Sequence, residues 1–185
     1  EKANESKGKE DILQKVQKSK NSPAKELLDI SLDAEEYTVT FVANGQTVTR
    51  KALFDWSKED NERIRYYSGT AIYKTTFPWK YKEQKDRQVY LHLGTVYNLA
   101  TVRVNGIDCG TVWTAPYRAD ITAALKKGTN ELEIEVTNTW ANALKGTDEG
   151  KAPFEGIWTN AKYRKQENTL LPGGLLGPLY LEQSN

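Results

Sequence analysis

Apolar and polar residues alternate in short runs from about residue 30 to the end of the chain. Tyr37, Val39 and Phe41 occupy every second position of one run. A later run, ELEIEV (131–136), places three aliphatic residues on one face and three glutamates on the other. A period of two is typical of β-strands that bury one face and leave the other in water. The pattern therefore predicts antiparallel sheets around one core.

Further runs rich in β-branched and aromatic residues predict more strands. They lie at 70–77, 88–94, 99–104 and 175–182. Two dipeptides, Asn44-Gly45 and Asn105-Gly106, separate strand-like runs. Both predict type I′ hairpin turns, because Asn and Gly tolerate positive φ.

Helix-forming patterns are scarce. Only residues 120–128 predict one short helical turn, capped by Asp120 or Thr122 and stopped by Gly128. Many short strands without strand–helix alternation predict an all-β antiparallel β-sandwich of the jelly-roll type, over residues 30–185.

Residues 1–29 have a different composition. They are rich in Lys and Glu and contain no aromatic residue. We interpret this polar segment as a linker or a tail from a preceding domain. A short docked helix is the alternative, with Ile12, Leu13 and Val16 on one face. The sequence contains no Met, and we expect it to be a fragment of a longer protein.

Charge and cysteine usage exclude several partners. Lys and Arg number 26 against 25 Asp and Glu, so the basic excess of a nucleic-acid-binding protein is absent from the sequence. No apolar run approaches the roughly 20 residues of a membrane span. The single cysteine, Cys109, cannot form an intrachain disulfide or a cysteine-based metal site alone.

Catalytic chemistry has weak candidates. The only histidine, His92, alternates with apolar neighbours in VYLHLG, which predicts an imidazole on an outer sheet surface or at a domain interface. Glycosidase chemistry needs two carboxylates across a sugar. Acidic residues near aromatic ones occur, but none lies in a recognisable catalytic motif; they are Asp108, Asp148, Glu149 and Glu155. We therefore predict no catalytic residue in this segment.

The aromatic content is the strongest functional signal, with 5 Trp and 10 Tyr. Sugars are bound by flat aromatic faces together with amides and carboxylates. Segments 111–118 and 137–150 combine these side chains, and a third candidate tryptophan, Trp158, follows in 152–164. Packing against a neighbouring domain, or within the core, is the alternative, and for Trp56 and Trp79 we expect the core. The candidate residues for carbohydrate binding or a domain interface are Trp113, Tyr117, Asn138, Trp140, Asn142, Asp148 and Trp158.

Ordered motifs resemble those of one enzyme group. They are LFDW (53–56), IRYYSGTAIY (64–73), VNGIDCGTVWTAPY (104–117), TNTWANALKGTD (137–148) and LLPGGLLGPLYL (170–181). In this order they resemble the galactose-binding-like, sugar-binding jelly-roll module of β-galactosidase-like glycoside hydrolases, and more closely that of α-L-rhamnosidase-type enzymes. Two positions depart from the pattern: Ala143 stands where arginine is usual, and Gly173 where serine is usual.

The resemblance implies a β-sandwich at the C-terminus of a longer glycoside hydrolase. The catalytic carboxylates would belong to a separate barrel domain of the same polypeptide, and the sandwich would brace it. The loops YYSGTA and TNTWANALKGTD are then expected near the active-site rim, and the location is expected to be periplasmic or extracellular. Such sandwiches often hold a structural calcium, but no D-x-D-x-D-G run is present, so we predict no cofactor and no metal.

Three functional hypotheses follow. The first is a non-catalytic accessory domain that packs on the catalytic domain and is also open to carbohydrate contact. The second is an autonomous carbohydrate-binding module. The third is a purely structural interaction domain, with its aromatic residues buried. The solvent exposure of four side chains, those of Trp113, Tyr117, Trp140 and Asn142, separates the second hypothesis from the third.

Overall fold

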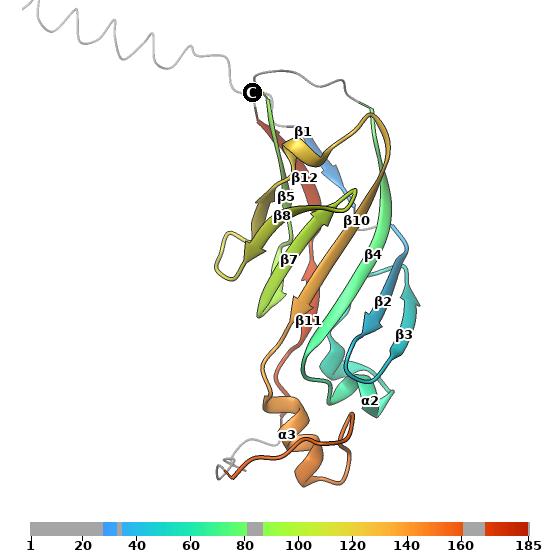
Figure 1. Ribbon diagram of the computed structural model, residues 1–185, viewed down its shortest axis with the longest axis vertical. Helices are drawn as coiled ribbons and strands as arrows, with labels where there is room; N and C mark the ends of the chain where they lie inside the picture. Colours follow the sequence, from blue (N-terminus) through green and yellow to red (C-terminus); the bar gives the residue numbers. More distant parts are fainter. Residues whose placement is uncertain (1–27, 33–34, 81–86, 161–168, 185) are drawn as a thin grey trace, which may run out of the picture.

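The computed structural model describes residues 28–32, 35–80, 87–160 and 169–184. These residues form two antiparallel sheets packed face to face, with a short two-stranded ribbon beside them (Figure 1). The predicted all-β sandwich is confirmed. Of the segment 1–29, predicted as a linker or tail, residues 1–27 lie outside the described residues, and residues 28 and 29 begin β1.

The larger sheet has six strands in the order β3-β2-β4-β10-β7-β8. Its two longest strands, β4 and β10, pair over their full length in the middle of the sheet. The bounds in this sheet are β2 Tyr37–Phe41, β3 Gln46–Arg50, β4 Thr70–Trp79, β7 Leu99–Val104, β8 Ile107–Val112 and β10 Gly128–Thr137.

The smaller sheet has four strands in the order β1-β12-β5-β9, and the ribbon pairs β11 with β6. Their bounds are β1 Leu28–Ser31, β5 Gln88–His92, β9 Arg118–Asp120, β12 Tyr180–Ser184, β6 Thr95–Tyr97 and β11 Gly174–Gly177. The runs predicted at 70–77, 88–94 and 99–104 became β4, β5 and β7, whereas the run at 175–182 was wrongly predicted as one strand and is divided between β11 and β12.

The core lies between the sheets and follows the alternation. Val39, Phe41 and Ile134 of the larger sheet and Leu91 and Leu181 of the smaller one are fully buried in one cluster. Trp56 and Trp79 belong to the same cluster, as expected. Burying apolar side chains is worth about 25 cal/mol per Å², so this shared cluster is the main stabilising contact between the layers.

The two Asn-Gly turns differ. Asn105 and Gly106 both have positive φ (51° and 78°), which confirms the predicted type I′ turn between β7 and β8. Between β2 and β3, only Gly45 of the pair has positive φ (67°), so the prediction of a type I′ turn at Asn44-Gly45 was wrong. The connection spans residues 42–45. Within it, the Asn44 side chain donates to the carbonyls of Arg63 and Pro153 and accepts from the Gln46 amide.

Within the residues that the structure describes, four short helices connect the strands, so the expectation of a single helical turn was wrong. They are η1 Trp56–Lys58, α2 Glu62–Arg65, η2 Thr122–Ala124 and α3 Ala141–Asp148. Only η2 was predicted; Asp120 accepts hydrogen bonds from the amide and the hydroxyl of Thr122 there. The segment 137–150 had been interpreted as a loop, yet most of it forms α3.

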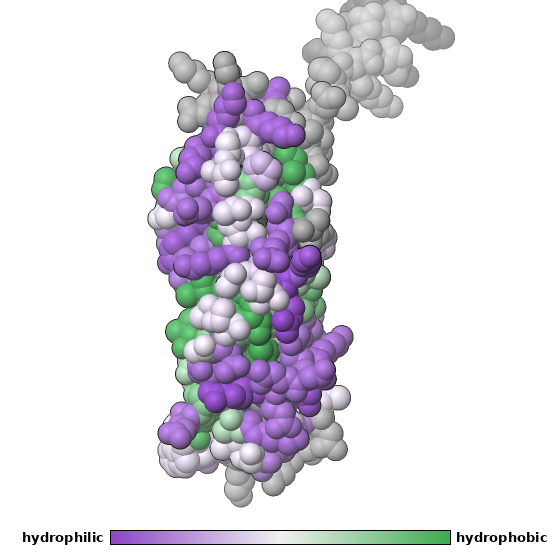
Figure 2. All heavy atoms as spheres, turned by 90° about the vertical axis from the view of Figure 1, so that its right-hand side faces the viewer, coloured by the Kyte–Doolittle hydropathy of each residue, from purple (hydrophilic) through white to green (hydrophobic). Residues whose placement is uncertain are grey.

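The described chain ends lie at one end of the sandwich. Leu28 pairs with Gln183 across β1 and β12. The helices α2 and α3 lie at the opposite end, with the β2–β3 connection (Figure 1). Seen from the β2–β3 side, hydrophilic residues cover most of the surface and hydrophobic ones gather around its middle (Figure 2).

Candidate functional site

The segments that carry the sequence motifs meet at the α3 end of the sandwich. The Asn138 side chain accepts from the Gly69 amide at 2.8 Å and donates to the Tyr67 carbonyl at 3.0 Å. The Ser68 hydroxyl accepts from the Ala143 amide at 3.0 Å, in the first turn of α3. Ser68 therefore caps a helix 75 residues away. YYSGTA and TNTWANALKGTD thus form one structural unit.

A second set of contacts joins α3 to the chain before β11. The buried Asn142 side chain donates to the Leu171 carbonyl at 2.7 Å and accepts from the Leu171 amide at 2.9 Å. Two residues on, Asp55 accepts from the Gly173 amide. The LLPGGLLGPLYL motif is thereby tied both to the helix and to the LFDW motif.

The LFDW motif is held in place by hydrogen bonds of Trp56 inside the core. Trp56 donates from Nε1 to the Tyr73 hydroxyl at 2.7 Å, and that hydroxyl also accepts from the Leu175 amide. Burial raises the pKa of the Tyr73 phenol well above its usual range. A Cβ on Gly174 would lie 2.5 Å from Trp56 Nε1, so this glycine is required by the close approach as well as by its φ of 103°.

Helix α3 also lies unusually close to Tyr66. A Cβ on Gly146 would lie 2.8 Å from the Lys151 carbonyl oxygen and 2.9 Å from Tyr66 Cβ. The Tyr66 hydroxyl donates to Glu149 at 2.7 Å. Burial, and then the hydrogen bond to Glu149, raise the pKa of Tyr66; burial also raises the pKa of the neighbouring Tyr67.

Apolar side chains are left exposed over this fixed framework. Trp140 is 57% exposed, Trp158 80%, Leu171 48% and Val42 55%. We call these four residues the end face. Phe154 lies beneath it and makes edge contacts with the rings of Trp140 and Tyr67. Of the sequence candidates, Trp140 packs on Phe154 at this end, Trp158 is exposed on the segment that follows α3, and Asp148 is exposed at the last residue of α3.

The two asparagines among the candidates have other contacts. The amides of Asn138 and Asn142 are bonded to backbone groups of the chain itself, and Asn142 is only 4% exposed. Their side chains hold segments together. A role of either amide in ligand binding remains a prediction.

Trp113 and Tyr117 lie elsewhere. Their segment leaves β8 in the larger sheet and enters β9 in the smaller one. In Figure 1 this crossing is on the flank of the sandwich, away from α3. Trp113 is 68% exposed, whereas Tyr117 is half-buried against the core. The structure does not bring these two residues together with the end face.

The two departures from the family pattern are both enclosed. Ala143 is fully buried, and its amide bonds to Ser68. A Cβ on Gly173 would lie 3.2 Å from both Asn138 Nδ2 and a Trp56 ring carbon. An arginine or a serine at these positions would require its neighbours to move.

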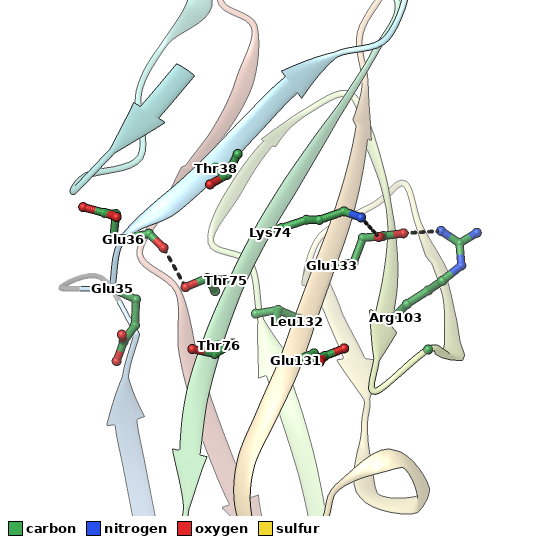
Figure 3. A pocket seen from close by; sticks show the side chains of 11 residues that line it. Glu35, Glu36, Thr38, Lys74, Thr75, Thr76, Arg103, Glu131, Leu132 and Glu133 are labelled. Carbon is green, nitrogen blue, oxygen red and sulfur yellow. Dashed lines mark hydrogen bonds and ion pairs between the residues drawn. The ribbon is translucent and has the colours of Figure 1, made fainter. Parts of the chain in front are cut away.

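A groove that was not predicted from the sequence lies on the outer face of the larger sheet (Figure 3). It has a volume of about 580 Å³. Glu133 accepts from Lys74 at 3.0 Å and from Arg103 at 3.1 Å across its floor. These cations lower the pKa of Glu133, the Lys74 hydrogen bond most strongly. Alternation predicted which side chains face outward, but not that they enclose a hollow.

The remaining candidates have structural contacts. His92 faces outward as predicted. Its Nε2 lies 2.5 Å from Glu182 Oε2, and its ring stacks on Tyr180 with 4.5 Å between the ring centroids.

Within the described ranges, no three His, Cys, Asp or Glu side chains are grouped so that they could hold a metal ion. No helix in the same ranges is both long and apolar enough to cross a bilayer.

The chain is similar to short parts of a rhamnosidase and of two proteins named as β-glucuronidases. A rhamnosidase from Novosphingobium sp. PP1Y superposes with a TM-score of 0.78 at 35% identity, over 87% of this chain and 15% of that one. A Formosa agariphila protein that carries the provisional name β-glucuronidase is 36% identical over 174 aligned positions, with 79% of this chain and 15% of that protein covered. The β-glucuronidase of Ruminococcus gnavus, at 18% identity and a TM-score of 0.60 over 85% of this chain and 28% of that one, shares the fold.

This chain therefore spans only about 15% of the length of its rhamnosidase and Formosa relatives. The family model described as glycosyl hydrolase 2 galactose-binding domain-like matches residues 48–170, which is more than half of the sequence. The chain belongs to that family of galactose-binding-like glycosyl hydrolase domains.

Proposed function

We propose that this chain is a non-catalytic accessory domain of a rhamnosidase-like glycoside hydrolase, and that it packs on the catalytic domain of the same polypeptide. One observation carries the proposal: 87% of this chain superposes on a rhamnosidase of which it covers only 15%. The rest of such an enzyme has ample length for a catalytic barrel. A periplasmic or extracellular location belongs to the same proposal, since polymeric glycans are met outside the cytoplasm.

The geometry of the motif residues supports this proposal. Asn138, Asn142 and Asp55 use their side chains to hold the backbone of distant segments. Of the acidic candidates, Glu149 is bonded to Tyr66, and Asp108 accepts from the Gly110 amide in the β7–β8 hairpin. A retaining or inverting glycosidase needs two carboxyl groups about 5–10 Å apart across a bound sugar. Asp108 lies on β8, in a different part of the fold from Asp148 and Glu149 at the end of α3.

Activity measurements test the proposal. We expect the 185-residue chain alone to show no turnover of aryl α-L-rhamnosides or aryl β-glucuronides above the uncatalysed rate. We expect the longer polypeptide that contains it to hydrolyse one of the two. Enzymatic turnover by the isolated chain, abolished by Asp148→Asn or Glu149→Gln, would refute a non-catalytic role.

A second function is an autonomous carbohydrate-binding module, and the exposure of Trp113 favours it. A 68% exposed indole offers a flat face for stacking on a sugar ring. Calorimetric titration of the chain with plant and host oligosaccharides tests this role. A Kd raised at least tenfold by Trp113→Ala would support it. The fluorescence of the buried Trp56, which this variant retains, shows that the variant is folded. Titrations of the wild-type chain that show no heat of binding would exclude this role for those glycans.

A further inference from the structure

We propose that the groove on the outer face of the larger sheet binds a short neutral oligosaccharide. Lys74, Thr76 and Glu131, which are exposed in the groove, bond the sugar hydroxyls. The groove is separate from Trp113, which does not line it, and a ligand there does not depend on the accessory role of the domain. Three features support a neutral sugar: the shape of the groove, its hydrogen-bonding groups and its charge.

The groove runs across the strands rather than along one of them. Its lining comes from the chain before β2, from β2, β4 and β10, and from β7 with its hairpin turn (Figure 3). Four of its side chains lie in register on neighbouring strands: Thr38, Lys74, Glu133 and Arg103. Strands about 4.8 Å apart make this row roughly 14 Å long, which suits a short oligosaccharide. The volume of about 580 Å³ is also within the usual range of ligand sites.

The floor of the groove is held in place by contacts within the chain. Glu133 accepts from Lys74 and from Arg103, and the pKa of Glu133 is lowered, so its carboxylate is charged at neutral pH. At one side, the Thr75 hydroxyl donates to the Glu36 carbonyl at 2.8 Å and fixes the chain before β2. Lys74 has three N–H donors and a side chain that is 64% exposed, so donors remain for a ligand. Groups that are already ordered lose little entropy on binding.

The hydrogen-bonding groups of the groove match a polyol. Thr76 and Glu131 are exposed and lie opposite each other on β4 and β10, with about 5 Å between such side chains. A hydroxyl donates and accepts, whereas a carboxylate only accepts, so the pair suits neighbouring sugar hydroxyls. Among the described residues that line the groove, Leu132 is the one aliphatic side chain, and it is buried. An apolar ligand therefore gains little contact here.

The charge of the groove favours a neutral sugar over an acidic one. Four glutamates line it, against one lysine and one arginine. Lys74 and Arg103 pair with Glu133, whereas Glu36 and Glu131 are exposed and have no ion pair among the described residues. Exposed charges act over about 8 Å at physiological salt, so a uronate carboxylate in the groove is repelled. A neutral sugar is not repelled, and its hydroxyls donate to charged acceptors, which form strong hydrogen bonds.

Calorimetric titration of the 185-residue chain tests the groove, with cellotriose and galactotriose as neutral probes and trigalacturonate as the acidic probe. We expect at least one neutral trisaccharide to bind, with a Kd at least tenfold lower than that of trigalacturonate. The double variant Thr76→Val with Glu131→Gln should raise that Kd at least tenfold. The matched control, Thr47→Val with Asp60→Asn, makes the same changes at exposed sites outside the groove and should leave the Kd unchanged. A thermal unfolding midpoint within a few degrees of wild type shows that each variant is folded.

Three results would overturn the proposal. The first is no heat of binding with either neutral trisaccharide. The second is sugar binding that is lost in Trp113→Ala but kept in the groove double variant, which places the sugar on the flank. The third is tighter binding of spermidine than of either sugar, which makes the groove a site for cations. Titration does not measure turnover, so hydrolysis of aryl glycosides by the isolated chain refutes the non-catalytic role without deciding what the groove binds.

Discussion

The two ends of the sandwich are closed by the same device, an asparagine amide bonded to backbone groups, yet they present opposite surfaces. At the η2 end, buried Asn130 accepts from the Lys126 amide and donates to the carbonyls of Lys126 and Gly128. Asn105, which forms the hairpin turn, also donates to Asn130. At the α3 end, Asn138 and Asn142 serve in the same way.

The two ends differ in the side chains that they expose to solvent. The chain around Asn130 exposes lysines, a glycine and a threonine at 126–129. The chain around Asn142 exposes Trp140 and Leu171. Closing a sandwich therefore does not require exposed tryptophans, because one end is closed without them. The apolar side chains exposed at the other end are therefore not explained by closure of the sandwich.

The largest stability effect is expected from Asn130→Ala. This change removes the partners of three backbone groups and of Asn105, and buried groups left without hydrogen bonds cost about 1–3 kcal/mol each. We expect a loss of about 3 kcal/mol in the free energy of unfolding, because water reaches part of the exposed Lys126 backbone. Urea denaturation measures it, with the exposed Asn160→Ala as the control. A loss below that of the control would show that this end closes without its asparagine.

A smaller effect is expected from Asn142→Ala at the α3 end. Two hydrogen bonds to Leu171 are lost, but Leu171 is 48% exposed and water replaces part of them. We expect a loss of about 2 kcal/mol, together with faster amide exchange in 169–174. The control is Asp148→Ala, on the exposed last residue of the same helix. Surface substitutions usually change the free energy of unfolding by no more than about 0.5 kcal/mol, and we expect the same here. Unchanged exchange in 169–174 would contradict the role given to Asn142.

The sheets could be predicted from alternation because the two-sheet core depends on it. Val39, Phe41 and Ile134 are buried where a period of two placed them. The Asn105-Gly106 turn was also predictable, since both residues take the positive φ that a type I′ turn requires. Local sequence was sufficient wherever the local backbone and one buried face decided the structure.

Helix α3 could not be predicted in this way, since its cap and its packing come from distant residues. Its first turn is capped by Ser68, and its buried side includes Asn142, Lys145 and Gly146 rather than an apolar stripe. The same reason explains Asn44, whose side chain bonds to Arg63 and Pro153 instead of shaping a tight turn. The candidate aromatic residues were visible in the sequence, but their separation into a flank and an end face depends on the topology.

The smallest expected effect separates the two ends by pH. Tyr66 donates to Glu149 at the α3 end, and Tyr66→Phe should cost about 1 kcal/mol at neutral pH, the usual worth of one hydrogen bond. Burial and Glu149 raise the pKa of Tyr66 in the folded state above its ordinary value of 10.0.

This shift makes the stabilisation by Tyr66 depend on pH. Below the unfolded-state pKa, the phenol is protonated in both states and the stabilisation is complete. As the pH rises through the folded-state pKa, the unfolded chain has already lost the proton, and the stabilisation disappears. The difference between wild type and Tyr66→Phe, measured in urea between pH 7 and 11, should therefore shrink above about pH 10. The deficit of Asn130→Ala, whose hydrogen bonds involve no tyrosine, should stay constant over the same range. A Tyr66→Phe deficit that does not change with pH would mean that Glu149 does not hold this phenol, and that the α3 end is closed by its asparagines alone.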